Sequence, residues 1–149
     1  MTTSAPHFTD EEKAEFVQHA LIALLWSTND GEHGNLDDEH GVEDIHPNTL
    51  AGFKANCEDF LEKNAEDLID AQDTFNYSLE QAGHDFSLSR NGHGAGFFDR
   101  NLEELGDRLQ AAAQEAGAAE AYLGDDGKIH IAGMERYGEP QPKPRKPKP

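Results

Sequence analysis

One stretch of this sequence, residues 84–100, restricts the possible folds more than any other. Apolar and serine side chains alternate at residues 86–89, as they do along a half-buried β-strand. Asn91-Gly92 follows and favours a tight turn, because asparagine and glycine both tolerate positive φ angles. A second apolar segment comes after the glycines. The pattern therefore predicts a β-hairpin with strands at about residues 85–90 and 95–99.

Ionisable and amide side chains are concentrated around this predicted hairpin. Two arginines beside a glycine-rich turn can hold a carboxylate or a phosphate by bidentate hydrogen bonds. The candidate ligand-binding residues are Asp85, Arg90, Asn91, His93, Asp99 and Arg100. In the alternative interpretation, Arg90 pairs with Asp85 or Asp99 inside the fold, and the glycines only shape the turn. His84 and His93 could share a metal ion with Asp85, or with His130 of the second predicted hairpin, but no spacing requires one, so we predict no metal and no other cofactor.

Apolar residues that recur at three- and four-residue steps predict three helices. The first covers about residues 10–28 and begins with a capping box, in which the side chains of Thr9 and Glu12 each bond to the other's backbone amide. The second covers about residues 48–72. The third ends at Gly117, a residue type that often terminates helices.

A second hairpin is predicted near the C-terminus, around a turn at residues 124–127. The order helix, helix, hairpin, helix, hairpin predicts an α+β fold, in which a small antiparallel sheet of about four strands packs against the helices. We expect a single domain at residues 10–138 with an acidic loop at 29–46. Residues 1–9 are expected to be a flexible N-terminus, and residues 139–149 a disordered, basic tail rich in proline and lysine.

The charge of the chain is strongly negative and unevenly distributed. The formal net charge is −18, and residues 1–80 carry 19 acidic against 3 basic side chains. Residues 81–139 carry 11 acidic and 5 basic side chains, whereas residues 140–149 carry 4 basic side chains and no acidic one. A field of this sign repels nucleic acid and anionic lipid and attracts basic protein surfaces. We therefore expect no direct nucleic acid binding by the core, no membrane binding, and a protein partner with a basic surface.

Acidic side chains follow one another at four-residue spacing on the predicted second helix. Like charges at this spacing destabilise a helix by a few tenths of a kcal/mol per pair, about 0.2–0.5, so the row indicates a use other than stability. The candidate partner-binding residues are Glu58, Glu62, Glu66, Asp67 and Asp70. The alternative interpretation is that the acidity serves only solubility.

The sequence lacks the common signatures of catalysis. It contains no nucleophile elbow, phosphate-binding loop, dinucleotide fingerprint or zinc-protease helix, so no catalytic residue is assigned. The single cysteine, Cys57, lies on an apolar helical stripe and is expected to be a buried, inert thiol. With no signal peptide and no long apolar run, we expect a soluble protein of a reducing compartment.

The central stretch also resembles a signature of small, uncharacterised tailed-phage proteins. Residues 84–100 read HDFSLSRNGHGAGFFDR, and the likeness continues at residues 23–28, 42–47, 105–109 and 122–127. Ser87 and Phe98 depart from the family, which often has tryptophan there. The resemblance implies a phage protein that acts in the cytoplasm of the host bacterium, and it brings no catalytic residues with it.

Three hypotheses follow from the sequence. The leading one is a non-enzymatic phage accessory protein whose acidic surface imitates DNA and inhibits a host or defence protein that handles nucleic acid. The second is a small-ligand or metal-binding domain centred on residues 84–100. The third is a minor virion or assembly protein.

Overall fold

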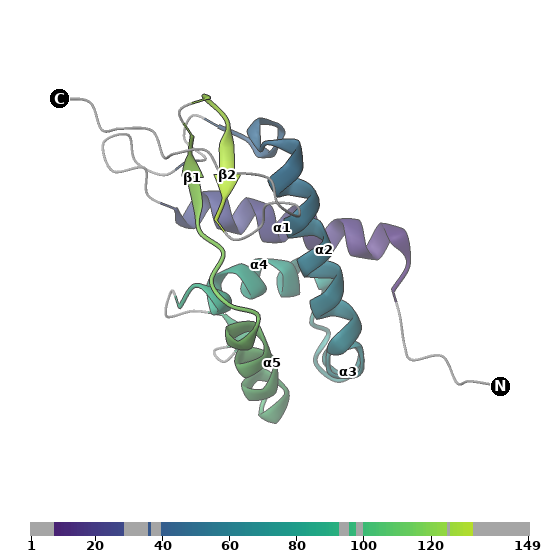
Figure 1. Ribbon diagram of the computed structural model, residues 1–149. Coiled ribbons are helices and arrows are strands. Elements are labelled where there is room, and N and C mark those ends of the chain that lie inside the picture. Colours follow the sequence, from purple (N-terminus) through teal and green to yellow (C-terminus); the bar gives the residue numbers. More distant parts are fainter. Residues whose placement is uncertain are drawn as a thin grey trace.

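The fold is mostly helical, with one small hairpin near the C-terminus (Figure 1). The computed structural model describes residues 8–28, 36, 40–92, 96–97, 100–124 and 126–132. The helices are α1 (Asp10–Ser27), the short 3-10 helix η2 (Val42–Asp44), α2 (Pro47–Lys63), α3 (Ala65–Phe75), α4 (Leu79–Arg90) and α5 (Glu104–Glu115). The strands are β1 (Ala121–Leu123) and β2 (Ile129–Ile131). The prediction of an α+β domain with two hairpins is therefore wrong.

Helix α4 occupies the place of the predicted central hairpin. The helix begins at Ser78, whose Oγ accepts a hydrogen bond from the backbone N–H of Gln81 at 3.1 Å. Residues 85–90 of α4 are all buried, so this part of the sequence does not show one apolar and one polar face. The buried serines are satisfied internally: Ser87 Oγ donates to the carbonyl of Ala20 at 2.6 Å, and Ser89 Oγ donates to Gln110 Oε1 at 2.7 Å. The alternation at residues 86–89 thus reflects two packed sides of a central helix.

Helices α1 and α4 cross in close contact at Gly83. A Cβ atom at this position would overlap the carbonyl oxygen of Phe16 on α1, so the crossing requires glycine. Next to it, the buried ring of Phe86 stacks on Phe60 from α2, with 4.1 Å between the ring centroids. Phe97 also packs against Phe60, with a centroid distance of 6.0 Å. Of the predicted strand at 95–99 only residues 96 and 97 are described, and neither is in a strand.

The predicted helix at residues 48–72 is two helices, α2 and α3. The break is at Asn64, whose φ and ψ angles of −117° and 20° are not helical. Its backbone N–H and its side-chain Nδ2 both donate to the carbonyl of Phe60, each at 3.0 Å, and this ends α2. Figure 1 shows α3 at the lower end of α2, with its axis turned towards the viewer.

The C-terminal hairpin was predicted, and the structure confirms it. Strands β1 and β2 pair antiparallel, with Ala121 opposite Ile131. The side chain of Thr49 on α2 fixes the hairpin to the helices, because its Oγ1 donates to the carbonyl of Ile131 at 3.0 Å and accepts from the N–H of Ile131 at 2.9 Å. The capping box of α1 is also confirmed: Thr9 Oγ1 and the carboxylate of Glu12 each accept from the other residue's backbone N–H.

Other predictions about organisation fall largely outside the described residues. The predicted flexible N-terminus is described only at residues 8 and 9, and the basic tail at 139–149 is not described. Within the described part of the predicted loop at 29–46 the chain forms η2. None of the helices in the described ranges has the length and apolar character that a membrane span requires.

Candidate functional site

Asp85, one of the predicted ligand residues, is fully buried on α4 and surrounded by hydrogen-bond donors. Arg100 donates two hydrogen bonds to its carboxylate, from Nη2 to Oδ1 at 2.8 Å and from Nε to Oδ2 at 3.0 Å. The hydroxyl of Tyr77 and the side-chain amide of Gln81 donate to Oδ2 as well, the latter at 3.2 Å. Asp85 and Arg100 were both candidate ligand residues, and in the structure they bind each other. The Asp85 carboxylate is therefore saturated by the protein.

Arg90 and Asn91 hold the connection that follows α5. The guanidinium of Arg90 donates from Nε to the carbonyl of Gly117 at 2.7 Å and from Nη2 to that of Ala116 at 3.3 Å. Its Cζ lies 4.6 Å from the centroid of the Phe86 ring, and its burial lowers the pKa of the guanidinium. The side chain of Asn91 exchanges two hydrogen bonds with the backbone of Ala119, at 2.9 and 2.7 Å. Both side chains thus stabilise the end of α5.

Residues 84–100 consequently form a structural network in the part that the structure describes. Arg90 donates to backbone carbonyls rather than to Asp85, and its other predicted partner, Asp99, lies outside the described residues. His93 and Asp99, the remaining candidate ligand residues, lie outside the described residues. His84 is half-buried, and its Nδ1 lies 3.7 Å from Asp85 Oδ1.

The predicted acidic face is divided between α2 and α3 by the break at Asn64. Glu62, Glu66 and Asp70 are exposed, whereas Glu58 is half-buried. Because the helix does not continue through Asn64, the four-residue spacing no longer places all of these carboxylates in one row. The acidic surface instead extends from α3 to α5, which lie beside each other at one end of the molecule (Figure 1).

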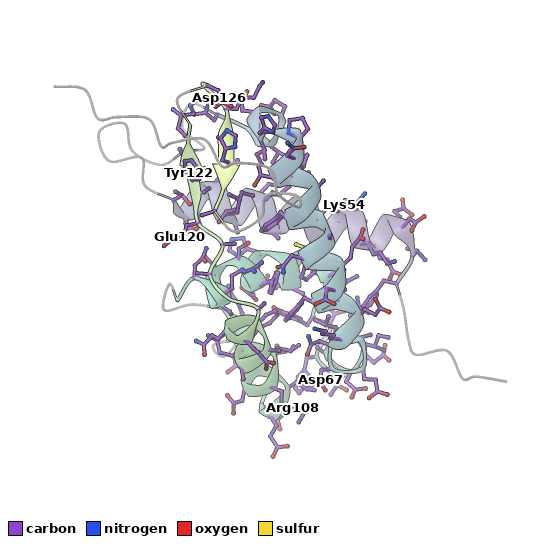
Figure 2. All side chains as sticks on the ribbon, in the orientation of Figure 1. Lys54, Asp67, Arg108, Glu120, Tyr122 and Asp126 are labelled. Carbon is purple, nitrogen blue, oxygen red and sulfur yellow. The ribbon has the colours of Figure 1, made fainter. Side chains whose placement is uncertain are left out.

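Asp67 and Arg108 join α3 to α5 within this acidic surface. Arg108 donates from Nη2 and Nε to the two carboxylate oxygens of Asp67, at 3.0 and 3.1 Å. The hydrogen bond to Asp67 raises the pKa of Arg108, and the charges of Asp67, Glu104 and Asp70 raise it further. Figure 2 shows Asp67 and Arg108 side by side at the lower end of the molecule, away from Glu120.

A cavity between α2 and α5, which the sequence did not predict, lies next to this acidic surface. Its volume is about 380 Å³. Its wall contains polar residues from α2, small apolar residues from α5 and the buried ring of Phe60. Asn56 lines the cavity, and its buried Oδ1 accepts no hydrogen bond within the described part of the chain. Sequence patterns give no signal for such an atom, because α2 would be amphipathic with or without it.

A histidine–carboxylate pair on the C-terminal hairpin also escaped prediction. The buried His130 has its Nε2 3.0 and 3.1 Å from the carboxylate oxygens of Asp126. Its ring stacks between those of His46 and Tyr122, at centroid distances of 5.1 and 5.6 Å. Burial would raise the pKa of Asp126, but hydrogen bonds from the N–H of Lys128 and from His130 outweigh it and lower the pKa. The described residues contain no group of three or more His, Cys, Asp or Glu placed to hold a metal ion.

Cys57 is buried as expected, and burial raises the pKa of its thiol well above the ordinary value. Two large apolar side chains of α1 are exposed to solvent, Ile22 by 42% and Trp26 by 52%. The indole of Trp26 lies against the ring of His84, with 5.9 Å between centroids.

Comparisons with known proteins add no family to this description. No family model matches the sequence, and searches of curated proteins and of solved structures found no match either. The resemblance to tailed-phage proteins therefore remains a prediction, and a functional proposal depends on the site itself.

Proposed function

We propose that this protein is a non-enzymatic accessory protein that binds a basic protein surface through its acidic end. The partner is a host or defence protein that handles nucleic acid, in the cytoplasm of a bacterium, and the carboxylates occupy positions meant for phosphates. One observation carries the proposal: α3 and α5 together hold seven carboxylates and a single cation, Arg108, which is already bound to Asp67.

The charge at this end works against folding. Glu66 and Asp70 are exposed at four-residue spacing on α3, where like charges are slightly destabilising. Neither forms an ion pair with a cation of the described residues. A solubilising role needs only scattered charges of both signs, whereas a concentrated field of one sign steers an oppositely charged partner.

The alternative of a ligand site at residues 84–100 has less support. A ligand that used Asp85 would have to displace Arg100, and one that used Arg90 would have to release the end of α5. Either exchange would leave buried polar groups without partners, which is costly. The acidic end requires no such exchange at its other carboxylates, because six of the seven are exposed and only Asp67 is bound to Arg108.

A pull-down from host lysate with matched charge variants tests the proposal. The double variant Glu66→Gln/Asp70→Asn removes two negative charges from the acidic end. The control Glu15→Gln/Glu120→Gln removes two exposed charges elsewhere, on α1 and before β1. Exposed charge pairs contribute about 0.2–1 kcal/mol each, so the first variant should bind the partner severalfold more weakly.

Salt and DNA provide the decisive comparison. The wild type and the control should release the partner as salt rises and should lose it to added duplex DNA, because charge complementarity is screened by salt and DNA would compete for the same basic surface. A partner that binds both double variants equally, or that ignores salt and DNA, would show that the acidic end is not the binding surface.

A further inference from the structure

The pair Asn91-Gly92 at the end of α4 has a chemical reactivity that the proposed function does not use. It is the only Asn-Gly pair in the sequence. The backbone nitrogen that follows an asparagine can attack the side-chain amide and form a five-membered succinimide ring. Glycine in the second position favours this attack, because it has no side chain to block the approach. Hydrolysis of the ring turns the asparagine into aspartate or into its backbone isomer, isoaspartate.

The fold holds Asn91 in a conformation from which this ring cannot close. Closure needs the nitrogen of Gly92 and the Cβ of Asn91 on the same side of the Cα–C bond. Asn91 has a ψ angle of 0°, which aligns the Gly92 nitrogen with the Asn91 nitrogen instead, about a third of a turn away from Cβ on the tetrahedral Cα. The ring can therefore form only after rotation about ψ.

Three hydrogen bonds oppose that rotation. The backbone N–H of Gly92 donates to the carbonyl of Ser89 at 3.3 Å. The side chain of Asn91 donates from Nδ2 to the carbonyl of Ala119 at 2.9 Å, and its Oδ1 accepts from the N–H of Ala119 at 2.7 Å. The last two bonds join the end of α4 to the connection between α5 and β1, residues 116–120. The ring can close only when this connection has opened.

We propose that Asn91 is a site of hydrolytic modification by water, controlled by local opening of the connection between α5 and β1. Gly92 is exposed, so solvent reaches its nitrogen. In the opened chain this nitrogen loses its proton to solvent and bonds to Cγ of Asn91, the Cγ–Nδ2 bond breaks, and the leaving nitrogen takes up protons from solvent. Water then cleaves the ring, at Cγ to give aspartate or at the backbone carbonyl carbon to give isoaspartate. The net change converts one amide and one water into one carboxylate and one ammonium ion.

The modification permanently removes a hydrogen bond that holds the connection. Aspartate has no side-chain N–H to donate, so a carboxylate oxygen would face the carbonyl oxygen of Ala119. Isoaspartate also adds a methylene group to the backbone, which displaces the chain at Gly92. Ala119 is fully buried, and a buried carbonyl that loses its donor destabilises the fold. Opening of the connection thus leads to a change that favours further opening.

Peptide mapping by mass spectrometry tests the site and its control by the fold. The full chain is incubated at mildly alkaline pH, folded in buffer and unfolded in guanidinium chloride. In the unfolded chain Asn91 should convert faster than any other asparagine. In the folded protein it should convert about tenfold more slowly or less, because the three hydrogen bonds have to break first. No conversion in the unfolded chain, or equal rates in the two states, would overturn the proposal.

Two variants show whether the connection controls the rate. Arg90→Met removes two hydrogen bonds to backbone carbonyls at the end of α5, so Asn91 should convert severalfold faster in this folded variant than in the wild type. The control Leu68→Ala truncates a buried side chain of α3 and lowers the stability of the whole fold, but it should keep the wild-type rate. All three proteins should convert alike when unfolded. A wild-type rate in folded Arg90→Met, or an equal increase in Leu68→Ala, would contradict control by the connection.

An aspartate variant tests the consequence of the modification. Asn91→Asp should lower the urea midpoint of unfolding, because the carbonyl of Ala119 loses its donor. The control Asn101→Asp introduces the same charge at an exposed asparagine and should leave the midpoint unchanged. Equal midpoints for the two variants would show that the modification does not release the connection.

Discussion

Two regions of this molecule use carboxylates in opposite ways. On α4, the buried Asp85 is hydrogen bonded to Arg100, Tyr77 and Gln81. On α3, Glu66 and Asp70 face solvent without an ion pair among the described residues. The first region contains the most chemically diverse stretch of the sequence, yet the carboxylate of Asp85 is fully engaged within the fold, and the buried His84 Nδ1 and Arg90 Nη1, which have no partner among the described residues, are out of reach of solvent. The second has a plain acidic composition, yet its groups remain available.

The comparison teaches that polar and charged groups without a partner in the fold indicate a binding site better than a variety of chemical groups in the sequence does. A buried polar group needs a partner, and once the fold supplies it, a ligand gains nothing by replacing that partner. Within the described residues, the largest concentration of exposed charge without an opposite partner is the set of carboxylates on α3 and α5.

The largest effect is expected when Arg90 is truncated. Arg90→Ala removes the hydrogen bonds to the carbonyls of Ala116 and Gly117 and the contact with the Phe86 ring, and it leaves a cavity in the core. The free energy of unfolding, measured with urea, should fall by about 4 kcal/mol. Arg90→Met keeps most of the packing and should lose only about half as much. A folded Arg90→Ala protein with unchanged stability would mean that this region is free to bind a ligand after all.

Truncation of the arginine at the acidic end should have a much smaller effect. Arg108→Ala removes an exposed ion pair with Asp67, and exposed pairs often contribute nothing measurable to stability. The urea midpoint should stay within experimental error of the wild type, and affinity for the basic partner should increase because the local charge becomes more negative. A large loss of stability in Arg108→Ala would remove the contrast between the two regions.

Patterns of apolar residues predicted the elements that have one buried face. The capping box and stripe of α1, the apolar face of α5 and the turn between β1 and β2 were all recognisable, because each element packs on one side and meets solvent on the other. The second half of helix α4 was mistaken for a strand because residues 85–90 are all buried. Its serines donate to Ala20 and Gln110, so polar residues there do not mark a solvent-facing side.

The contacts of the candidate site residues could not be predicted, for a different reason. The sequence placed Asp85 and Arg100 in the same candidate site but could not show that they would form an ion pair with each other. The break between α2 and α3 depends on the non-helical backbone angles of Asn64. An asparagine alone does not predict such a break, so the sequence did not show that the acidic surface would extend towards α5. The sequence also could not show that the oxygen of Asn56 is buried without a hydrogen-bond partner, because this depends on how the helices pack.

The most direct measurement compares the unfolding free energies of two variants, Asp85→Asn and Asn56→Leu, by urea denaturation under the same conditions. Asp85→Asn breaks a buried pair and should lose about 3 kcal/mol, whereas Asn56→Leu removes an unsatisfied buried oxygen and should lose nothing or gain up to about 1 kcal/mol. This result would show that the Asp85 carboxylate stabilises the fold through its partners, whereas the unpartnered Asn56 oxygen does not stabilise it. Equal losses in the two variants, or a stable Asp85→Asn and a destabilised Asn56→Leu, would contradict the account.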